Sequence, residues 1–245
     1  MTWPVRISQW LGRALLPPRC LVCETPGAGG RDLCAACAQV LPWPGPACPR
    51  CALPVAAGGR CGRCLRRGSP LDAALAALAY RFPVDRLLPR FKFHGDLAAG
   101  RLLAQLMAEG LAPGLAGSPL PGAVVPVPLH PSRLRQRGYD QALELARPVA
   151  AALGLPLRPE ALRRTRATAA QTTLDAGARR GNVRAAFACR PGVLPAHVAL
   201  LDDVMTTGAT LGECAGALRL AGVSRVDAWV LARAPPPGRG DQPNV

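Results

Sequence analysis

The segment that most constrains the fold is Val198–Thr210, with the sequence VALLDDVMTTGAT. Its first four apolar residues predict a buried strand of a parallel sheet, and the following residues 211–220 have helical character. Gly208, in the turn between them, permits a tight backbone path. A strand that feeds a helix through a short turn is the unit of an α/β sheet, so the sequence predicts an α/β domain built on parallel strands.

The polar residues of this segment predict a ligand site. Ligands of open α/β sheets bind where the carboxyl ends of strands meet the starts of helices. Asp202 and Asp203 lie there and can accept hydrogen bonds from sugar hydroxyls or approach a metal ion. Backbone N–H groups and hydroxyls for a phosphate come from the turn, which consists of Thr206, Thr207, Gly208, Ala209 and Thr210. The alternative, an ordinary strand–turn–helix with an Asp or Thr cap, needs neither adjacent carboxylates nor three hydroxyls.

This motif is similar to the one with which type I phosphoribosyltransferases bind phosphoribosyl pyrophosphate. The resemblance implies that Asp202 and Asp203 hold the ribose 2′ and 3′ hydroxyls and that the threonine turn wraps the 5′-phosphate. It also implies Mg²⁺ bound with phosphoribosyl pyrophosphate, and displacement of pyrophosphate at the ribose C1 carbon. No residue stands out as a general base, so the acceptor nucleophile stays open.

Eight of the ten cysteines precede residue 65 and form four Cys-x-x-Cys pairs separated by ten, ten and nine residues. The pairs are Cys20/Cys23, Cys34/Cys37, Cys48/Cys51 and Cys61/Cys64. Two such pairs supply four thiolates to one tetrahedral Zn²⁺, so the sequence predicts two structural zinc ions. Sequential pairing gives two consecutive zinc ribbons, and a cross-braced pairing is also open. The segment is rich in Gly and Pro and cannot build much core without metal.

Other uses of these cysteines fit the sequence less well. A disulfide framework requires an oxidising compartment, and no cleavable signal peptide is evident. Iron–sulfur ligation usually shows less even spacing, although iron stays open as an alternative. Two cysteines stand alone: we expect Cys189 in a loop and Cys214 on the helix after the phosphate turn.

The chain has a formal net charge of +15, and 29 of its 30 basic residues are arginine. A codon bias toward Arg, Ala, Gly and Pro explains part of this surplus, but it does not explain the scarcity of acidic residues. A surplus of this size favours a polyanionic partner, and we expect nonspecific, salt-sensitive binding of single-stranded DNA. The amino-terminal apolar stretch is too short and too charged to span a bilayer, so no transmembrane segment is predicted.

Particular cations are expected to contact pyrophosphate or nucleic acid. Lys92, the only lysine, lies in a predicted loop between two helices. Three arginines at two-residue spacing, Arg133, Arg135 and Arg137, lie in a predicted loop over residues 130–141, before a helix at 141–153. A merely solvated basic surface is the alternative for all of them.

The zinc module is expected to extend the DNA-binding surface. It contributes Arg50, Arg60, Arg63, Arg66 and Arg67. Tyr139 and Trp43 are placed by the sequence to stack on bases. In contrast, charge-removing changes at Arg233 and Arg239 near the carboxyl terminus are expected to alter DNA binding little.

Further motifs resemble one particular family. They are Val-Pro-Val-Pro followed by Arg-x-Arg-Gly-Tyr-Asp-Gln, Arg164-Thr-Arg166, Gln171–Leu174, Arg179–Val183 and Ala186-Phe187. With the cysteine pairs, and over roughly residues 15 to 232, they resemble the ComF family of competence-associated, phosphoribosyltransferase-like proteins. The resemblance implies handling of internalised single-stranded DNA in the cytoplasm, with DNA-uptake proteins as partners. Asp140 departs from the family pattern, which more often has asparagine, and its carboxylate is expected to pair with Arg137 and weaken anion binding there.

We therefore expect a type I phosphoribosyltransferase-like parallel sheet with an amino-terminal double zinc ribbon. The expected segments are a helix at 1–16, the double zinc ribbon at 17–68, the phosphoribosyltransferase domain at 70–234 and a disordered tail at 235–245. A mobile loop at 163–184 is expected to close on the pyrophosphate. Two functions stay open: an enzyme that transfers a phosphoribosyl group to an unknown acceptor, and a catalytically silent nucleic-acid-binding protein that uses the phosphate pocket for ligand sensing.

Overall fold

The computed structural model describes residues 17–235 except positions 57, 166–185, 191 and 193. The predicted amino-terminal helix at 1–16, the mobile loop beyond residue 165 and the tail from 236 onward lie outside the described residues.

A four-stranded parallel sheet forms the centre of the molecule. Its strand order is β1-β6-β5-β2, and the strands are β1 (Ala73–Ala79), β6 (Arg225–Arg233), β5 (His197–Met205) and β2 (Ala123–Pro126). Each strand is joined to the next by a helical crossover, which parallel strands require. The prediction of a parallel α/β sheet is confirmed. The strand predicted to end at Asp202 is interior to the sheet, and it continues through the acidic pair to Met205.

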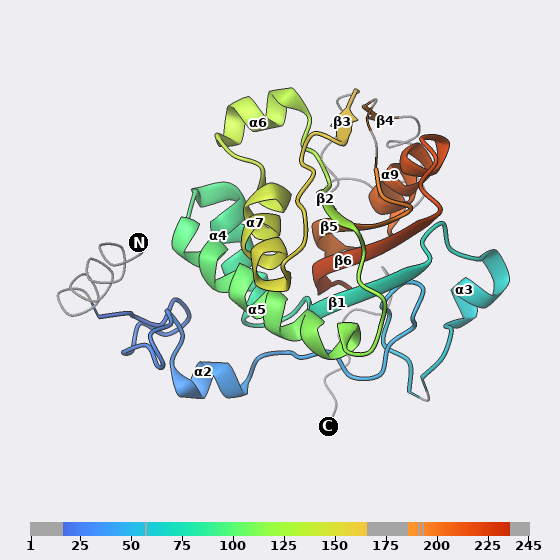
Figure 1. Ribbon diagram of the computed structural model, residues 1–245. Coiled ribbons are helices and arrows are strands. Elements are labelled where there is room, and N and C mark those ends of the chain that lie inside the picture. Colours follow the sequence, from blue (N-terminus) through green and yellow to red (C-terminus); the bar gives the residue numbers. More distant parts are fainter. Residues whose placement is uncertain (1–16, 57, 166–185, 191, 193, 236–245) are drawn as a thin grey trace.

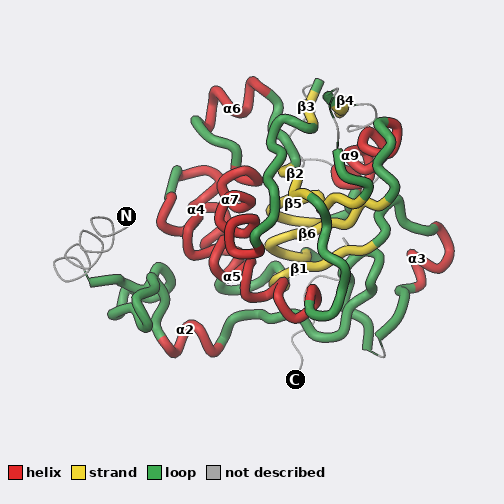
Figure 2. The backbone as a smooth tube through the Cα atoms, in the orientation of Figure 1, coloured by secondary structure: helices red, strands yellow, loops and turns green. Residues whose placement is uncertain are grey.

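Helices cover both faces of this sheet, as Figures 1 and 2 show. One face carries α4 (Val84–His94), α5 (Leu97–Leu115) and α7 (Gln141–Leu153), and the other carries α9 (Ala209–Leu220). Alternation along the strands divides the core accordingly. Leu201 and Trp229 pack with α4, α5 and α7, whereas Leu200 and Val230 pack with Leu211 of α9. Burial on both faces explains why β5 begins as a continuous apolar run.

Three local predictions are corrected by the structure. The arginine loop forms a short helix, α6 (Pro131–Arg137), because Pro131 suits a first helical position and Gly138 ends the helix in a left-handed conformation. Lys92 and His94 belong to the last turn of α4 and not to a loop, and the helix ends at Gly95. Finally, Cys189 lies on β4 (Phe187–Cys189), which pairs antiparallel with β3 (Leu162–Arg164).

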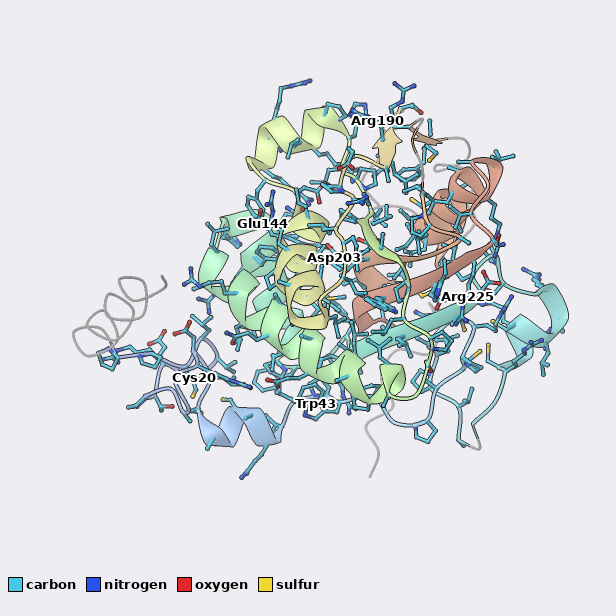
Figure 3. All side chains as sticks on the ribbon, viewed as in Figure 1. Cys20, Trp43, Glu144, Arg190, Asp203 and Arg225 are labelled. Carbon is cyan, nitrogen blue, oxygen red and sulfur yellow. The ribbon has the colours of Figure 1, made fainter. Side chains whose placement is uncertain are left out.

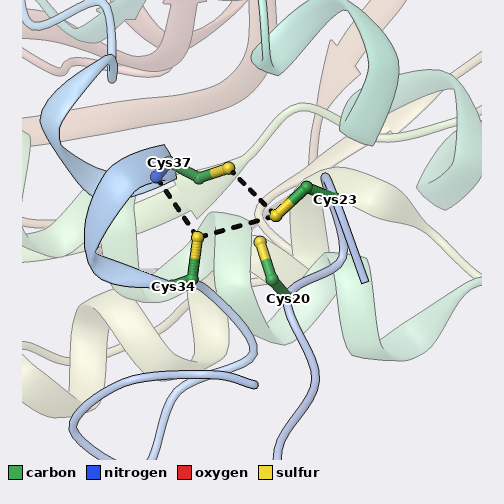
Figure 4. A group of neighbouring side chains, drawn as sticks. All are labelled: Cys20, Cys23, Cys34 and Cys37. Carbon is green, nitrogen blue, oxygen red and sulfur yellow. Dashed lines mark hydrogen bonds between the residues drawn. The ribbon is translucent and has the colours of Figure 1, made fainter. Parts of the chain in front are cut away.

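The eight amino-terminal cysteines form two separate groups of four. The groups are Cys20, Cys23, Cys34 and Cys37, and Cys48, Cys51, Cys61 and Cys64. Within each group the Sγ atoms lie within 4.8 Å of one another, and neighbouring pairs such as Cys23 and Cys34 are 3.6 Å apart (Figure 4). A tetrahedral zinc ion with bonds of about 2.3 Å holds its sulfurs about 3.8 Å apart, whereas a disulfide needs about 2 Å. The pairing is therefore sequential, and each group fits one zinc ion.

The two ribbons pack on different parts of the α/β domain. The first contacts the helical layer: Arg90 of α4 donates to the Leu21 carbonyl at 2.6 Å, and Arg31 forms an ion pair with Glu109 of α5. The second contacts the sheet, where the Ala74 N–H donates to the Pro49 carbonyl at 2.8 Å. Figure 1 shows the corresponding helices α2 (Ala35–Gln39) and α3 (Gly62–Arg67) on different sides of the molecule. Zinc binding and folding of the whole chain are thus physically connected.

Each ribbon is expected to carry one zinc ion. Elemental analysis should find two zinc ions per chain, and Cys37→Ser and Cys64→Ser should each retain one. Both variants should also unfold at lower temperature, because a metal that binds only the folded chain stabilises it. Cys189→Ser is the matched control and should keep both ions, since Cys189 lies outside either group. Iron in the purified protein, or eight reactive thiols in folded metal-free protein, would contradict the assignment.

Candidate functional site

A cleft of about 620 Å³ opens at the carboxyl ends of β5 and β2. It is lined by side chains from several elements, among them Lys92, Arg133, Arg137, Arg164, Asp202, Asp203, Thr206 and Thr210. In Figure 3 Asp203 lies near the middle of the molecule, whereas Cys20 and Arg225 lie toward its periphery. The tertiary fold thus gathers residues from four separate stretches of the chain around the acidic pair.

The acidic pair is held by its own backbone and by one cation. The Asp202 carboxylate accepts from the Asp203 N–H at 2.8 Å, and the Asp203 carboxylate accepts from the Val204 N–H at 2.5 Å. Lys92 Nζ lies 2.7 Å from Asp203 Oδ2, with both side chains mostly buried. Burial and the adjacent Asp203 carboxylate raise the pKa of Asp202 to about 8. The two carboxyl groups therefore differ: Asp203 is paired with a cation, and Asp202 has lost most of its solvation.

The turn after β5 has the geometry expected of an anion-binding helix start. Gly208 caps α9 with φ of 80°, a left-handed conformation, and a Cβ at this position would lie 2.7 Å from the Met205 side chain. The Thr207 hydroxyl accepts from the Ala209 N–H at 3.3 Å. Residues 204–211 surround a small depression that also includes Asp202. The residues predicted to bind the ribose and those predicted to bind the 5′-phosphate therefore lie next to each other.

The predicted arginine surface divides in the folded chain. Arg133 and Arg137 line the cleft, whereas Arg135 is exposed and lies outside its lining. Arg137 donates to the Gln141 side chain at 3.0 Å, and its guanidinium stacks 5.1 Å from the centre of the Phe93 ring. These contacts orient Arg137 toward the cleft.

The predicted pairing of Asp140 with Arg137 is wrong. Asp140 caps α7 by accepting from the Leu143 N–H at 3.1 Å, and it also accepts from the Leu129 N–H at 2.9 Å. Burial raises the pKa of this carboxyl group. The departure from the family pattern therefore leaves Arg137 available to an anion.

The residues expected to stack on bases are differently placed. Tyr139 lines the cleft and is half-buried, but its hydroxyl donates to the Phe91 carbonyl and its ring packs 5.4 Å from that of Phe91, so part of it is engaged within the fold. Trp43 is 40% exposed but is absent from the cleft lining. Phe93 is 60% exposed and lines the cleft beside Lys92. Sequence reasoning missed Phe93, although its place next to the only lysine was a signal.

The arginines of the zinc module have different roles. Arg50 donates to the Asp72 carbonyl at 2.8 Å and to the Ser69 carbonyl at 3.2 Å, which joins the second ribbon to the segment before β1. Arg63 donates to the Thr207 carbonyl at 3.3 Å. The exposed members of the group are Arg60, Arg66 and Arg67.

Two buried arginines have roles that the sequence analysis did not assign to them. Arg164 of β3 lines the cleft and stacks 5.2 Å from the centre of the Phe187 ring. Arg233, expected to contribute little to DNA binding, is 4% exposed and donates to the carbonyls of Cys51, Met205 and Thr206. Arg233 is buried because β6 carries its last residue into the interior, and its small contribution to DNA binding stays a prediction. An arginine at the end of an apolar strand was the available signal.

No helix among the described residues is long and apolar enough to cross a membrane.

Comparisons with known proteins agree with the architecture. The family model of the double zinc ribbon domain matches residues 11–65. DNA utilization protein YhgH is 33% identical in Salmonella typhi and 34% in Escherichia coli K12, over 89% of this chain and 98% of each relative. Competence protein F of Haemophilus influenzae is 37% identical over 71% of this chain and 78% of its own length. The resemblance seen in the motifs is confirmed, and the chain belongs to the ComF family.

Proposed function

We propose that the cleft binds phosphoribosyl pyrophosphate together with Mg²⁺. The observation that carries this proposal is the meeting of the acidic pair and the threonine turn in one cleft with four cations, Lys92, Arg133, Arg137 and Arg164. The carboxylates suit ribose hydroxyls and a divalent cation, and the turn suits a 5′-phosphate at a helix start. The cations suit the pyrophosphate group. No single one of these features requires this ligand, but the ligand uses all of them.

We further propose that the protein acts in DNA uptake or DNA utilization and binds single-stranded DNA. The relatives that match this chain over most of their length are named for DNA utilization and for competence. The net charge of +15 and the exposed arginines Arg60, Arg66, Arg67 and Arg135 supply an electrostatic basis for binding a phosphate backbone. Partners among DNA-uptake proteins follow from the same relatives.

Two activities are compatible with this cleft. In a phosphoribosyltransferase, Lys92, Arg133 and Arg137 would stabilise the departing pyrophosphate while the turn holds the 5′-phosphate and orients C1 toward an acceptor. In a catalytically silent protein the same contacts would sense the ligand. Pyrophosphate release with a panel of nucleobases, measured with and without single-stranded DNA, separates the two. Release that depends on Asp202 favours the enzyme.

Phosphoribosyl pyrophosphate with Mg²⁺ should raise the unfolding midpoint, because a ligand that binds only the folded chain stabilises it. At about one hundred times its Kd the gain is about 2.7 kcal/mol. Asp203→Asn and Thr207→Val should remove most of the shift, since both alter groups that face the proposed ligand. Differential scanning fluorimetry and calorimetry measure the effect. Asp227→Asn, at the other end of the sheet, is the control, and an equal shift in all variants would place the ligand elsewhere.

The raised pKa of Asp202 predicts a pH dependence of stability. The folded chain favours the protonated form of Asp202. The contribution of this group to the free energy of unfolding is therefore complete below about pH 4 and is lost as the pH rises through about 8. Asp202→Asn cannot ionise, so its unfolding midpoint should decline less than that of the wild type between about pH 5 and about pH 9. Parallel curves for the two proteins would show that this group titrates normally.

Single-stranded DNA should bind with little sequence preference and with affinity that falls steeply with salt. Replacing Arg133, Arg135 and Arg137 by glutamine should lower both the affinity and the salt slope. The matched control replaces three exposed arginines elsewhere, Arg101, Arg147 and Arg158. Fluorescence anisotropy at several salt concentrations compares the two triple variants. Equal losses in both would mean that net charge alone attracts DNA.

A further inference from the structure

Arg233 joins the second zinc ribbon to the phosphate turn. It is the last residue of β6 and is buried. Its Nε atom donates to the carbonyl of the zinc ligand Cys51 at 2.8 Å. Its Nη1 atom donates to the carbonyls of Met205 at 2.6 Å, Thr206 at 2.7 Å and Ala234 at 2.5 Å. One rigid guanidinium fork therefore fixes a residue of the metal site and the first two carbonyls of the turn.

A second arginine reinforces this connection. Arg63 lies next but one to the zinc ligand Cys61 and donates to the Thr207 carbonyl at 3.3 Å. Three consecutive carbonyls, those of Met205, Thr206 and Thr207, thus face guanidinium groups. In a planar trans peptide the N–H of the next residue points away from the carbonyl. The N–H groups of residues 206–208 are therefore directed away from the two guanidinium groups, and these are the donors that a phosphate in the turn needs.

The zinc centre supplies an electrostatic reason for this arrangement. One Zn²⁺ and four thiolates carry a net charge of about −2, which favours cations close to the ligands. The guanidinium of Arg233 is buried and donates directly to the carbonyl of the ligand Cys51. Loss of the metal would leave a buried guanidinium with less compensation, which is costly. The second zinc ion and the position of Arg233 therefore support each other.

The first ribbon offers an internal comparison. Its contacts with the domain run to α4 and α5, through Arg90 with Leu21 and through Arg31 with Glu109. Among the described residues, no hydrogen bond joins the first ribbon to residues 205–210. Loss of the first zinc ion should therefore affect stability without the specific effect on the turn that loss of the second should have.

We propose that Arg233 is a positioning residue through which the second zinc site holds the phosphate turn in its anion-binding conformation. The affinity for a 5′-phosphate then depends on occupancy of the second zinc site and not on occupancy of the first. The part of this proposal that concerns phosphate affinity rests on the proposed function, which takes the turn as the phosphate site. The physical coupling between the second ribbon and the turn does not depend on that function.

The variants Arg233→Met and Arg233→Lys test the proposal. Arg233→Met removes both the positive charge and the planar guanidinium group. Arg233→Lys keeps the charge but lacks the guanidinium group that donates to several carbonyls at once. Hydrogen exchange of the amides at 205–210 should rise in both, and the affinity for ribose 5-phosphate should fall at least about tenfold in Arg233→Met. The control is Arg219→Met, because Arg219 also bridges segments, through Ser224 and Asp72, but at the other end of the sheet. Arg219→Met should leave both the amide exchange at 205–210 and the affinity for ribose 5-phosphate unchanged.

Zinc-ligand variants test the direction of the coupling. Cys64→Ser should raise amide exchange at 205–210, whereas Cys37→Ser, with one ion lost from the first ribbon, should not. Because Cys64 and Arg233 act through one connection, the double variant should lose little more phosphate affinity than either single variant. Zinc release followed with a chromogenic chelator should be faster from Arg233→Met for one of the two ions only.

The outcomes separate this proposal from the proposed function. If wild-type protein fails to bind ribose 5-phosphate, the function fails, and the exchange and zinc-release measurements still decide the coupling. If Arg233→Met does not fold, Arg233→Lys decides. Lower unfolding midpoints with unchanged exchange at 205–210 and unchanged phosphate affinity would overturn the proposal, since a merely structural role predicts that result.

Discussion

Two adjacent carboxyl groups near the end of an interior strand are the constraint on which the rest of the site depends. Placing Asp202 and Asp203 side by side with little solvent is unfavourable unless cations or hydrogen-bond donors lie close. The fold brings Lys92 to Asp203 from the end of α4, and the backbone N–H groups of β5 donate to both carboxylates. These contacts do not fully compensate, and burial, together with the adjacent Asp203 carboxylate, raises the pKa of Asp202. A bound cation and a polyhydroxylated ligand would stabilise the ionised form of the two carboxyl groups. The acidic pair therefore has a physical reason to bind both.

Metal binding replaces apolar packing in the amino-terminal part of the chain. Each group of four thiolates holds a short Gly- and Pro-rich segment that has few large apolar residues of its own. The two ribbons have nearly the same ligand spacing, with ten residues between the cysteine pairs of the first and nine between those of the second, and they contact different structures. The first lies against α4, which carries Lys92, and the second lies against β6 and the turn that follows β5. Within the described part of the chain, only the second ribbon is therefore joined by hydrogen bonds to the turn of the proposed ligand site.

The arginine surplus has more than one physical origin. Arg50, Arg90 and Arg233 donate to backbone carbonyls and hold segments of the fold together. Arg133, Arg137 and Arg164 line the cleft. Others, such as Arg60, Arg66 and Arg67, are exposed. The net charge predicted a polyanionic partner, but it treated all these residues alike. Net charge contains no information on which guanidinium groups make contacts within the fold.

The sequence by itself determined the elements whose pattern is local. The buried strand before Asp202, the turn with Gly208, the helix at 141–153 and the four cysteine pairs all follow from short-range periodicity, backbone requirements or ligand spacing. Only the tertiary structure decided the pairing of the cysteines, the ion pair of Lys92 with Asp203, the capping role of Asp140 and the burial of Arg233. These are contacts between segments far apart in the chain or choices among nearby partners of similar chemistry. Spacing along the sequence cannot rank such partners, since their distances are set by how the helices and ribbons pack against the sheet.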